Sequence, residues 1–405
     1  MKKQIYILVI LLTIFLIGCE RDGIFSIDGL TLDYGEEGME FIDQLSYPID
    51  LALNDDGENA VALGHNSQEA RLFIHESNNE IKWMDNFELE RLRDRFNRLS
   101  NFIKMPSGHF FISGIMGPAS SSELDVSFIR KVSPSGKEEW TKTYTDSTYN
   151  YWSRGIIPIN ENRILLFSEK TIHLSTEVND YNLSIVNLEG EVIKSKDIIN
   201  RNNEIISHQL FAGIDGSFFV STISFDENAI GLSHYDSELN LLWNQKIPLD
   251  QDIAPYRFKL LPNQWGGILL LFSTEIGSGP NTYIKVLSLN NDGNLIAEKG
   301  QINSNWDDSV VDAIPTKDGN ILILANSFSG DREDRDILLS KMDSNGNILW
   351  SVNYGGSKTD LGHKVIETQS GNIILFGYQW NNSRGNDIFK DKTFMLRLTA
   401  NGELL

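Results

Sequence analysis

Short apolar runs that each follow a polar turn recur along the whole chain. A turn of small polar residues, usually with a glycine, leads seven times into three to five consecutive apolar residues. In the clearest case Ser370-Gly371-Asn372 precedes Ile373-Ile374-Leu375-Phe376. Runs of this length suit strands that are buried on both faces, and the turn before each favours a hairpin. The other six runs are Ala60–Leu63, Phe110–Ile112, Ile164–Phe167, Phe218–Val220, Ile268–Phe272 and Ile321–Leu324.

These turns are evenly spaced. The intervals between them are 51, 54, 54, 51, 52 and 52 residues, measured at Gly57, Gly108, Asn162, Gly216, Gly267, Gly319 and Gly371. Each interval holds a second turn, such as Asp343–Asn347, which leads into a further strand. Asn-Gly and Asp-Gly turns need a positive φ, so strand–turn–strand is the natural interpretation. Four strands in about 50 residues, repeated seven times, predict an all-β fold: a seven-bladed β-propeller of four-stranded antiparallel blades over residues 46–405.

The first residues predict export and lipidation. Lys2 and Lys3 precede an apolar stretch, Ile5–Phe15, and Leu16-Ile17-Gly18-Cys19 follows it. This stretch is too short to span a membrane comfortably, because a spanning helix needs ~20 apolar residues. The pattern resembles the bacterial lipobox, in which a small residue precedes the acylated cysteine. We therefore expect a lipoprotein signal peptide at residues 1–18 and a lipid anchor on Cys19 as the sole membrane contact; an ordinary signal peptide or a short membrane anchor is the alternative.

Residues 19–45 are predicted to form a lipidated tether that includes a strand to close the ring. We expect residues 26–34 to supply that strand, because propellers usually complete the last blade with a strand from the other terminus. The acidic sequence Glu20-Arg21-Asp22 loosely resembles the surface-export tether of Bacteroidota lipoproteins. The resemblance implies the outer membrane or cell surface, and leaves a periplasm-facing location open.

The C-terminal repeats carry a resemblance to a known group. The stretch Asp343–Gly356, continued by Ser370–Gly377, is similar to the repeat of uncharacterised Bacteroidota propeller proteins within the broad PQQ-like group. The similarity covers residues 307–405 and fades toward the N-terminus. It implies fold and lineage rather than an activity.

One segment departs from the repeat. Leu89, Leu92, Phe96 and Leu99 have helical spacing, which predicts a short helix over residues 86–100. The segment carries four arginines, which could dock an anionic partner. Because glutamate and aspartate lie three or four residues from these arginines, a solvated helix face is the favoured interpretation.

Composition and motifs argue against several functions. The formal net charge is −21, with 35 Lys and Arg against 56 Asp and Glu, which disfavours nucleic-acid binding. Cys19 is the only cysteine, so an intrachain disulfide and a cysteine-based zinc site are excluded. The histidines are scattered, and the acidic segments Asp343–Asn347 and Asp331–Asp336 lack the ligand spacing of an EF-hand. We therefore predict no catalytic residues, metal or cofactor, and keep a quinone-cofactor or carbohydrate-active enzyme as the alternative.

Aromatic residues in the expected loops are the candidate binding residues. Trp83, Trp140, Trp243 and Trp350 recur at one repeat position and are predicted to pack between strands. The aromatics that do not recur offer a surface for stacking on sugars or anchoring a protein; they are Tyr149, Tyr151, Trp152, Trp306 and Trp380. The sequence thus favours a monomeric, non-catalytic envelope lipoprotein that binds a protein partner or a glycan through one propeller face.

Overall fold

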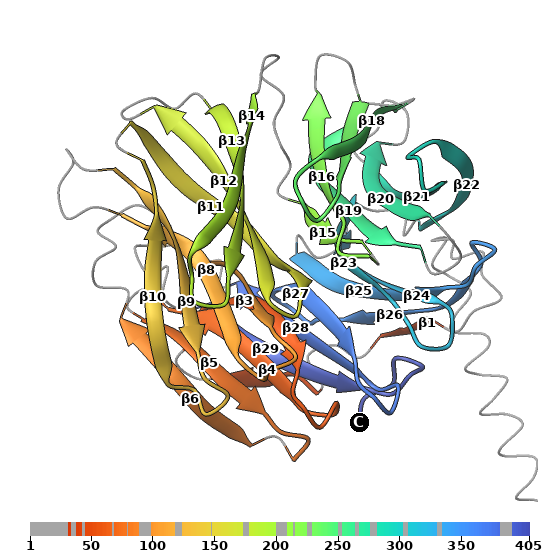
Figure 1. Cartoon of the computed structure of the whole chain (residues 1–405). Coiled ribbons are helices and arrows are strands. Elements are labelled where there is room, and N and C mark those ends of the chain that lie inside the picture. Colours follow the sequence, from red (N-terminus) through yellow and green to blue (C-terminus); the bar gives the residue numbers. More distant parts are fainter. Residues whose placement is uncertain are drawn as a thin grey trace, which may run out of the picture.

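The chain forms a ring of seven antiparallel β-sheets, and the predicted all-β, seven-bladed propeller is confirmed (Figure 1). This computed structural model describes residues 31–33, 38–42, 45–66, 69–78, 80–88, 99–117, 124–146, 148–172, 178–199, 209–213, 215–224, 229–249, 253–263, 267–275, 282–302, 307–329, 334–380 and 391–405. Four consecutive strands make up each of the first six blades, and three make up the seventh.

The strands follow one another blade by blade. Blade 1 contains β3 (Tyr47–Leu53), β4 (Ala60–His65), β5 (Glu69–His75) and β6 (Ile81–Glu88). Blade 2 contains β7 (Leu99–Lys104), β8 (Phe110–Met116), β9 (Val126–Val132) and β10 (Glu138–Tyr144). Blade 3 contains β11 (Tyr149–Asn160), β12 (Arg163–Ile172), β13 (Val178–Asn187) and β14 (Val192–Ile199). Blade 4 contains β15 (Leu210–Ala212), β16 (Phe218–Ser224), β17 (Ala229–Tyr235) and β18 (Leu241–Pro248).

The remaining blades have the same order and recruit two further strands. Blade 5 contains β19 (Ile253–Pro262), β20 (Ile268–Glu275), β21 (Thr282–Leu289) and β22 (Leu295–Ile302). Blade 6 contains β23 (Asp307–Pro315), β24 (Ile321–Ser329), β25 (Asp334–Met342) and β26 (Ile348–Tyr354). Blade 7 contains β27 (Thr359–Glu367), β28 (Ile373–Trp380) and β29 (Lys392–Leu398). The recruited strands are β1 (Thr31–Asp33) and β2 (Glu40–Ile42).

The first strand of each blade is the innermost. Innermost strands of neighbouring blades contact one another, as β3 does β7 and β23 does β27. One side of the ring, which we call the link face, carries the links between blades and the connections from second to third strands. The opposite side, which we call the turn face, carries the hairpin turns from first to second and from third to fourth strands.

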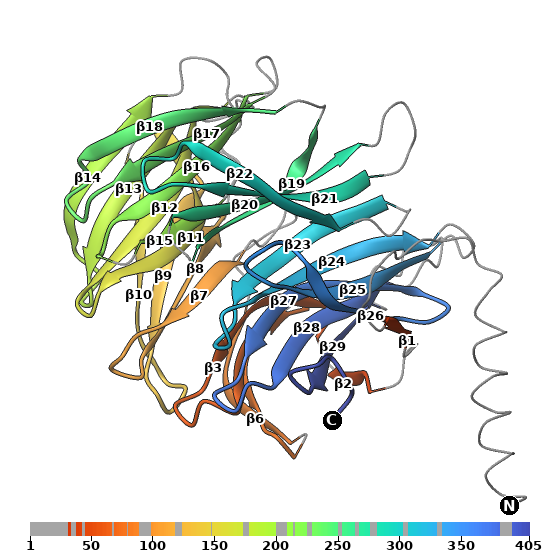
Figure 2. The same cartoon turned by 90° about the vertical axis from the view of Figure 1, so that its right-hand side faces the viewer.

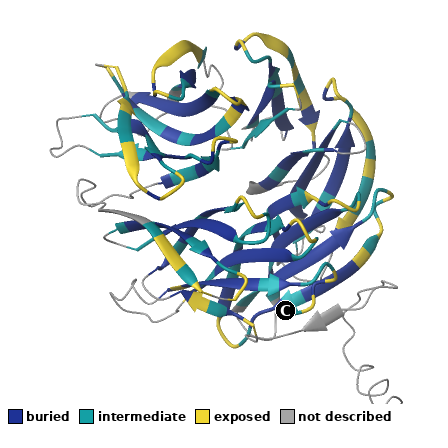
Figure 3. Ribbon diagram, turned by 60° about the horizontal axis from the view of Figure 1, so that its bottom comes forward, coloured by how far each residue is buried: buried dark blue, intermediate teal, exposed yellow. Residues whose placement is uncertain are grey.

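The apolar runs found in the sequence form the second strands and build the core. Ala60–Leu63 of β4 and Ile321–Leu324 of β24 are at most 1% exposed. Their side chains alternate between two clusters because a blade packs against a neighbour on each face: Leu165 and Phe167 meet blade 4, whereas Ile164 and Leu166 meet blade 2. Figure 3 shows this burial along the strands, with exposed stretches at the outer rim.

One turn structure recurs between third and fourth strands. The Asp343 carboxylate Oδ1 accepts hydrogen bonds from the backbone N–H groups of Asn345 (2.8 Å) and Asn347 (2.9 Å). Asp236 and Asn290 make the equivalent pair of bonds in their turns. Side chains of this type stabilise turns by replacing a backbone acceptor, so the acidic segment Asp343–Asn347 is explained by its hairpin.

A tryptophan in one blade packs on the turn of the next. A Cβ atom at Gly293 of blade 5 would lie 2.6 Å from the ring of Trp243 in blade 4, so only glycine fits between them. The same contact joins Trp140 to Gly190 and Trp350 to Gly402. The packing role predicted for these three tryptophans is confirmed, while Trp83 lies against Phe73 and stays 43% exposed.

The ring is closed by a different N-terminal segment from the one predicted. β2 pairs antiparallel with β29, Phe41 opposite Phe394, and becomes the outer strand of blade 7 (Figure 2). β1, which lies within the predicted residues 26–34, instead pairs parallel with β26 at the outer edge of blade 6. The prediction for residues 26–34 is therefore wrong. Only four residues separate β2 from β3, so β2 must lie beside blade 1, where the closing position is.

The helix predicted over residues 86–100 is wrong at both ends. β6 continues to Glu88 and β7 begins at Leu99, whose side chain is buried as a strand residue between blades 1 and 2. Residues 89–98, with the four arginines, lie outside the described residues. So do residues 1–30, with the predicted signal peptide and Cys19. Within the part of the chain that the structure describes, no helix is long and apolar enough to cross a membrane.

Candidate functional site

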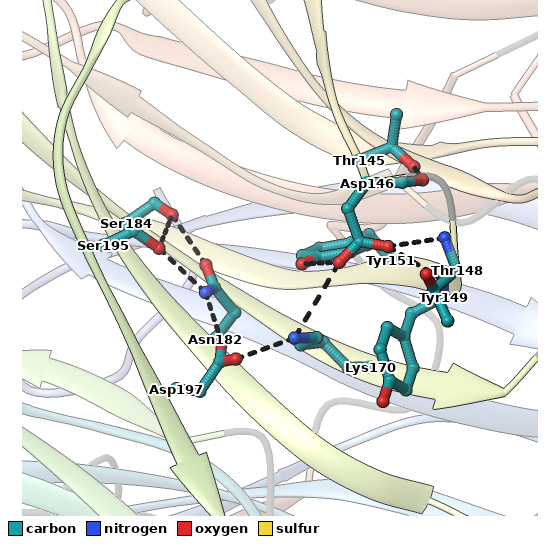
Figure 4. A network of polar contacts seen from close by, with 10 residues as sticks. All are labelled: Thr145, Asp146, Thr148, Tyr149, Tyr151, Lys170, Asn182, Ser184, Ser195 and Asp197. Carbon is teal, nitrogen blue, oxygen red and sulfur yellow. Dashed lines mark hydrogen bonds and ion pairs between the residues drawn. The ribbon is translucent and has the colours of Figure 1, made fainter.

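The link face of blade 3 brings two of the predicted aromatics together. Tyr149 and Tyr151 lie on β11 and both face Lys170 of β12 (Figure 4). The Lys170 Nζ atom is 4.6 Å from the centre of the Tyr149 ring and 5.5 Å from that of Tyr151. A lysine over two aromatic faces is held by cation–π attraction, which strengthens when water is excluded. Lys170 is 5% exposed.

Two carboxylates complete this cluster. The Lys170 Nζ atom donates to Asp197 Oδ2 at 2.8 Å and lies 3.9 Å from Asp146 Oδ2. The Tyr151 hydroxyl donates to the same Asp146 oxygen at 2.9 Å. Asp146 belongs to the link between blades 2 and 3, and its other oxygen accepts from the backbone N–H groups of Thr148 and Tyr149. We call Asp146, Tyr149, Tyr151, Lys170 and Asp197 the lysine cluster.

A row of amide and hydroxyl groups continues the lysine cluster across blade 3. The Asn182 amide donates to Asp197 Oδ1 at 2.7 Å and to the Ser195 hydroxyl at 2.8 Å. The Ser184 hydroxyl donates back to the Asn182 carbonyl oxygen at 2.6 Å. Asn182 and Ser184 are buried, whereas Asp197 is 46% exposed, so the network runs from the interior of blade 3 to solvent (Figure 4).

The electrostatics fix the protonation states of three members of the lysine cluster. Burial opposes the charge on Lys170, but the bond to Asp197 and the neighbouring Tyr151 raise its pKa. Burial and the bond to Asp146 raise the pKa of Tyr151 to about 12. Burial also disfavours ionised Asp146, yet its bonds from Thr148 and Tyr149 hold the pKa of that carboxyl below its usual range. Asp146, Tyr151 and Lys170 therefore keep their charge states near neutral pH, which suits the cluster to binding by fixed donors, acceptors and rings.

Trp152 has a different role from its two tyrosine neighbours. Its indole Nε1 donates to Asp125 Oδ2 at 2.9 Å, and the backbone N–H of Tyr151 donates to the Asp125 carbonyl oxygen at 2.9 Å. Asp125 directly precedes β9, so these bonds join blade 2 to blade 3. Trp152 therefore positions the strand that carries Tyr149 and Tyr151.

The other predicted site residues are separate from the lysine cluster. Trp380 ends β28, on the link face of blade 7, and is 46% exposed. Blade 7 and blade 3 are not neighbours in the ring, so Trp380 does not join the cluster. Trp306 and Cys19 lie outside the described residues.

A second link-face cluster was not found from the sequence. The ring of Tyr47, at the start of β3, lies 5.4 Å from that of His65 and 5.7 Å from that of Tyr378. Burial and the neighbouring Asp391 carboxylate raise the pKa of Tyr47 to about 12. The cluster joins blade 1 to blade 7. Tyr378 lies two residues before Trp380 on the same strand. Its closeness to a predicted site residue was the one sequence signal that could have pointed to this cluster.

Charged residues on the innermost strands form a third group. Lys259 of blade 5 pairs with Asp312 of blade 6 at 2.6 Å, and Lys364 of blade 7 pairs with Asp50 of blade 1 at 3.3 Å. Asp50 and Asp312 together raise the pKa of Lys364. Asp50, Asp312 and Lys364 each follow a register shift in the first strand of their blade. Aligning the seven repeats would have placed these three at one position.

Comparison with known proteins supports the fold and no more. No family model matches the sequence, and no curated protein is similar to it. A Lactobacillus plantarum protein of known structure is 8% identical, with a TM-score of 0.51 over 82% of this chain and 93% of that chain. Domains 1–2 of Drosophila semaphorin 1a are 10% identical, with a TM-score of 0.50 over 91% of this chain and 88% of that chain.

A puromycin hydrolase is also similar, at 12% identity and a TM-score of 0.49 over 82% of this chain. The chain spans half the length of that hydrolase. At identities of 8% and 10%, the similarity to the Lactobacillus plantarum and semaphorin structures supports the fold alone.

Proposed function

We propose that this chain is a membrane-anchored, non-catalytic β-propeller that binds a glycan through its link face. The lysine cluster carries the proposal. The rings of Tyr149 and Tyr151 provide apolar faces, and Asp197 and Asn182 provide hydrogen-bonding groups beside them. Binding sites commonly combine aromatic surface with a few fixed polar groups, which is the chemistry that sugar rings with hydroxyls require.

The anchor and the location belong to the same proposal. We infer that Cys19 is acylated after removal of residues 1–18 and that residues 19–45 connect the anchor to the ring. The location would be the outer membrane or the cell surface, and the lineage that of Bacteroidota propellers of the PQQ-like group. The lipobox-like sequence and the C-terminal repeats support these inferences. We expect the anchored protein to be a monomer.

A glycan array tests the binding proposal. The purified protein should retain one class of glycan, and Tyr149→Ala should weaken binding about tenfold, which corresponds to ~1.4 kcal/mol. Lys170→Met should have a similar effect, because it removes the cation that orients both rings. Trp83→Ala is the matched control: it removes an aromatic side chain that is 43% exposed and lies outside the lysine cluster, so binding should be unchanged. Retention unaffected by Tyr149→Ala and Lys170→Met would contradict the proposed site, and cleavage of the retained glycan would contradict the non-catalytic role.

A protein ligand is the second candidate, favoured by the half-exposed Trp380 on the same face. Cross-linking in native cells followed by affinity purification would test it. One stoichiometric partner, lost in Trp380→Ala and kept in Trp83→Ala, would assign the link face of blade 7 to that partner. If nothing co-purifies, the protein-partner candidate fails and the glycan remains.

A further inference from the structure

Blades 3 to 6 each begin their fourth strand with exposed aliphatic residues. These are Val192 and Ile193 of β14, Leu241 and Leu242 of β18, Leu295 and Ile296 of β22, and Leu349 of β26. Their exposed fractions run from 42% to 61%. All seven directly follow the third-to-fourth-strand turns, so they lie at the outer edge of the turn face. We call them the aliphatic rim.

A β-bulge recurs at the start of each of these four strands, and one rim residue in each strand is the extra residue. In blade 5 Leu295 pairs with Leu289 and Ala297 with Ser288, which leaves Ile296 as an extra residue. The same register shift makes Leu242 and Leu349 extra residues in blades 4 and 6. A bulged residue leaves the pleat of the strand, and such bulges recur where a side chain must be re-aimed. The exposed extra residue is thus a feature of each of these four repeats.

The rim covers only part of the ring. Blade 2 has the same bulge, but it presents Glu139 there, after Glu138. Blade 1 carries the exposed Lys82 just after its turn. The outer edge of the turn face is therefore apolar on blades 3 to 6. It carries two glutamates on blade 2, and on blade 1 it carries Lys82 beside the half-exposed Trp83. Exposed apolar residues that gather on one side of a protein are candidates for contact with proteins or membranes.

The direction of β1 favours a membrane over a protein as the surface that the aliphatic rim contacts. β1 runs parallel to β26, with Thr31 opposite Ser351 and Asp33 opposite Asn353. β26 starts at the turn face, so β1 also runs away from the turn face, and its N-terminal end points toward it. Eleven residues separate Cys19 from Thr31. Even fully extended they span at most about 40 Å, so an acyl anchor on Cys19 keeps this part of blade 6 near the bilayer.

We propose that the aliphatic rim rests on the phospholipid bilayer that holds the acyl chains of Cys19. The turn face at blades 3 to 6 then meets the membrane, and the link face with the lysine cluster points away from it. This inference rests on the proposed lipid anchor. Aliphatic side chains enter the interfacial layer of a bilayer, and their contribution adds to that of the acyl chains.

The charge of the neighbouring turns selects the lipid. Glu191 and Asp292 are exposed in the turns that precede the rim residues of blades 3 and 5, whereas Glu238 in blade 4 pairs with Arg163 and Lys194. Negative groups are repelled by anionic headgroups within a Debye length of the surface. The rim is therefore suited to a zwitterionic bilayer, and adding phosphatidylglycerol to the vesicles should weaken its contact.

Single nitroxide labels on the full, membrane-purified chain test this orientation. Cys19 is the only cysteine, and acylation through a thioether leaves it no free thiol, so the wild-type chain should take up no thiol label. Labels at Leu242→Cys and Ile296→Cys should collide roughly fivefold less often with an aqueous nickel chelate when the protein sits on phosphatidylcholine vesicles. Glu139→Cys, at the same bulge in blade 2, and Thr148→Cys, on the link face, are the controls and should stay accessible.

Each contrary result has one meaning. Labelling of the wild-type chain would refute the anchor, and with it the basis of the inference. An unlabelled wild type with freely accessible labels at positions 242 and 296 would leave the anchor standing and overturn the membrane contact. Shielding that increases with the protein-to-lipid ratio would assign the rim to a second copy of the chain, which also overturns the proposal.

Discussion

At the residue scale, a buried histidine joins the closing strand to the ring. His75 of blade 1 is 1% exposed; its Nδ1 atom lies 3.3 Å from an Arg397 Nη2 atom, and its Nε2 atom lies 3.0 Å from Glu40 Oε2. An arginine can only donate, so Nδ1 accepts and the neutral ring carries its hydrogen on Nε2. Glu40 and Arg397 also line a pocket of about 280 Å³ at the blade 7–blade 1 junction of the turn face. The neutral imidazole of His75 therefore contributes to the closure of the propeller.

Acid should therefore weaken the fold through His75. Burial and the neighbouring Arg397 lower the pKa of His75 to about 4. Because the folded pKa lies below the unfolded value of about 6.5, this stabilisation is complete above pH 6.5 and is lost as the pH falls toward 4. Over that interval the free energy of unfolding should fall by about 3 kcal/mol from this residue. Denaturant unfolding between pH 7 and 4 measures it.

The variant His75→Gln isolates that contribution. Glutamine keeps an acceptor for Arg397 and does not titrate, so its unfolding curve should depend less steeply on pH. Burial lowers the pKa values of His65 and His363 too, but both remain in the variant and cancel in the comparison. Burial raises the pKa of Glu40, which works in the opposite direction. Equal slopes for wild type and variant would exclude His75 as the acid-sensitive group.

The candidate site could be predicted from the sequence only in part. Tyr149 and Tyr151 were identified because they break the repeat, but the loop expected there is wrong, since both residues lie on strand β11. Lys170 and Asp197 were not, because they lie on β12 and β14 and reach the tyrosines only through strand pairing. Trp152 shares the same sequence signal as the tyrosines yet bonds to Asp125 of another blade. Local sequence marked these aromatics as departures from the repeat, but it did not identify the partner of each ring.

At the scale of elements, the contact between a tryptophan and the next blade's turn sets the blade spacing. Gly293 has φ +77° and faces the Trp243 ring. The turn needs a residue that tolerates this φ, and the tryptophan needs a residue without a Cβ. The repeated glycine therefore meets two demands at once, one local and one between blades.

Two alanine variants should separate these demands. Gly371 has φ +88°, and a Cβ atom at this position would meet no other atom within 4 Å. Gly371→Ala should therefore lower the free energy of unfolding by about 1–2 kcal/mol through backbone strain alone. Gly293→Ala adds the clash with Trp243 and should cost about 2–4 kcal/mol. Chemical denaturation measures both. Equal costs for the two variants would mean that the tryptophan contact does not constrain the blade.

The choice of β26 as the partner of β1 follows from the charges on the outer strands. The paired residues Ser351, Val352 and Asn353 are uncharged. The free edges elsewhere carry lysines, such as Lys194 and Lys196 on β14 and Lys246 on β18. Charged side chains on an edge strand discourage a further strand from pairing. Blade 6 alone among blades 3 to 6 lacks a charged residue in its outer strand.

At the scale of the whole molecule, closure of the ring depends on three residues of β2. A chain that starts at residue 38 keeps β2 and should unfold nearly as the longer chain does. A chain that starts at residue 45 loses Met39 and Ile42, which are buried, and should lose about 2–5 kcal/mol of stability. Hydrogen exchange should show lost protection at Thr393–Met395, the partners of β2. Unchanged protection there in the shorter chain would contradict this role.

The repeat made the fold predictable, and the exceptions to the repeat did not follow from it. Each blade has its own turn, buried run and outer strand, so seven weak signals reinforced one another. β2 has no such support, because Glu40–Ile42 is only three residues long and outside the repeat. The apparent helix at residues 86–100 included Leu99, whose burial comes from β7. For β2 and for residues 86–100, which have no counterpart in the other blades, the hydrophobic pattern alone did not identify the strands.

The position of β1 has a mechanical consequence. A load applied through the N-terminal segment from the turn face would act along β1, parallel to its pairing with β26. Hydrogen bonds that lie across the direction of pull share the force and break together, in shear, rather than being unzipped one after another. The load would reach the body of blade 6 before it reached β2. The pairing of β1 with β26 would therefore carry tension on the N-terminal segment before that tension reached the pairing of β2 with β29, which closes the ring.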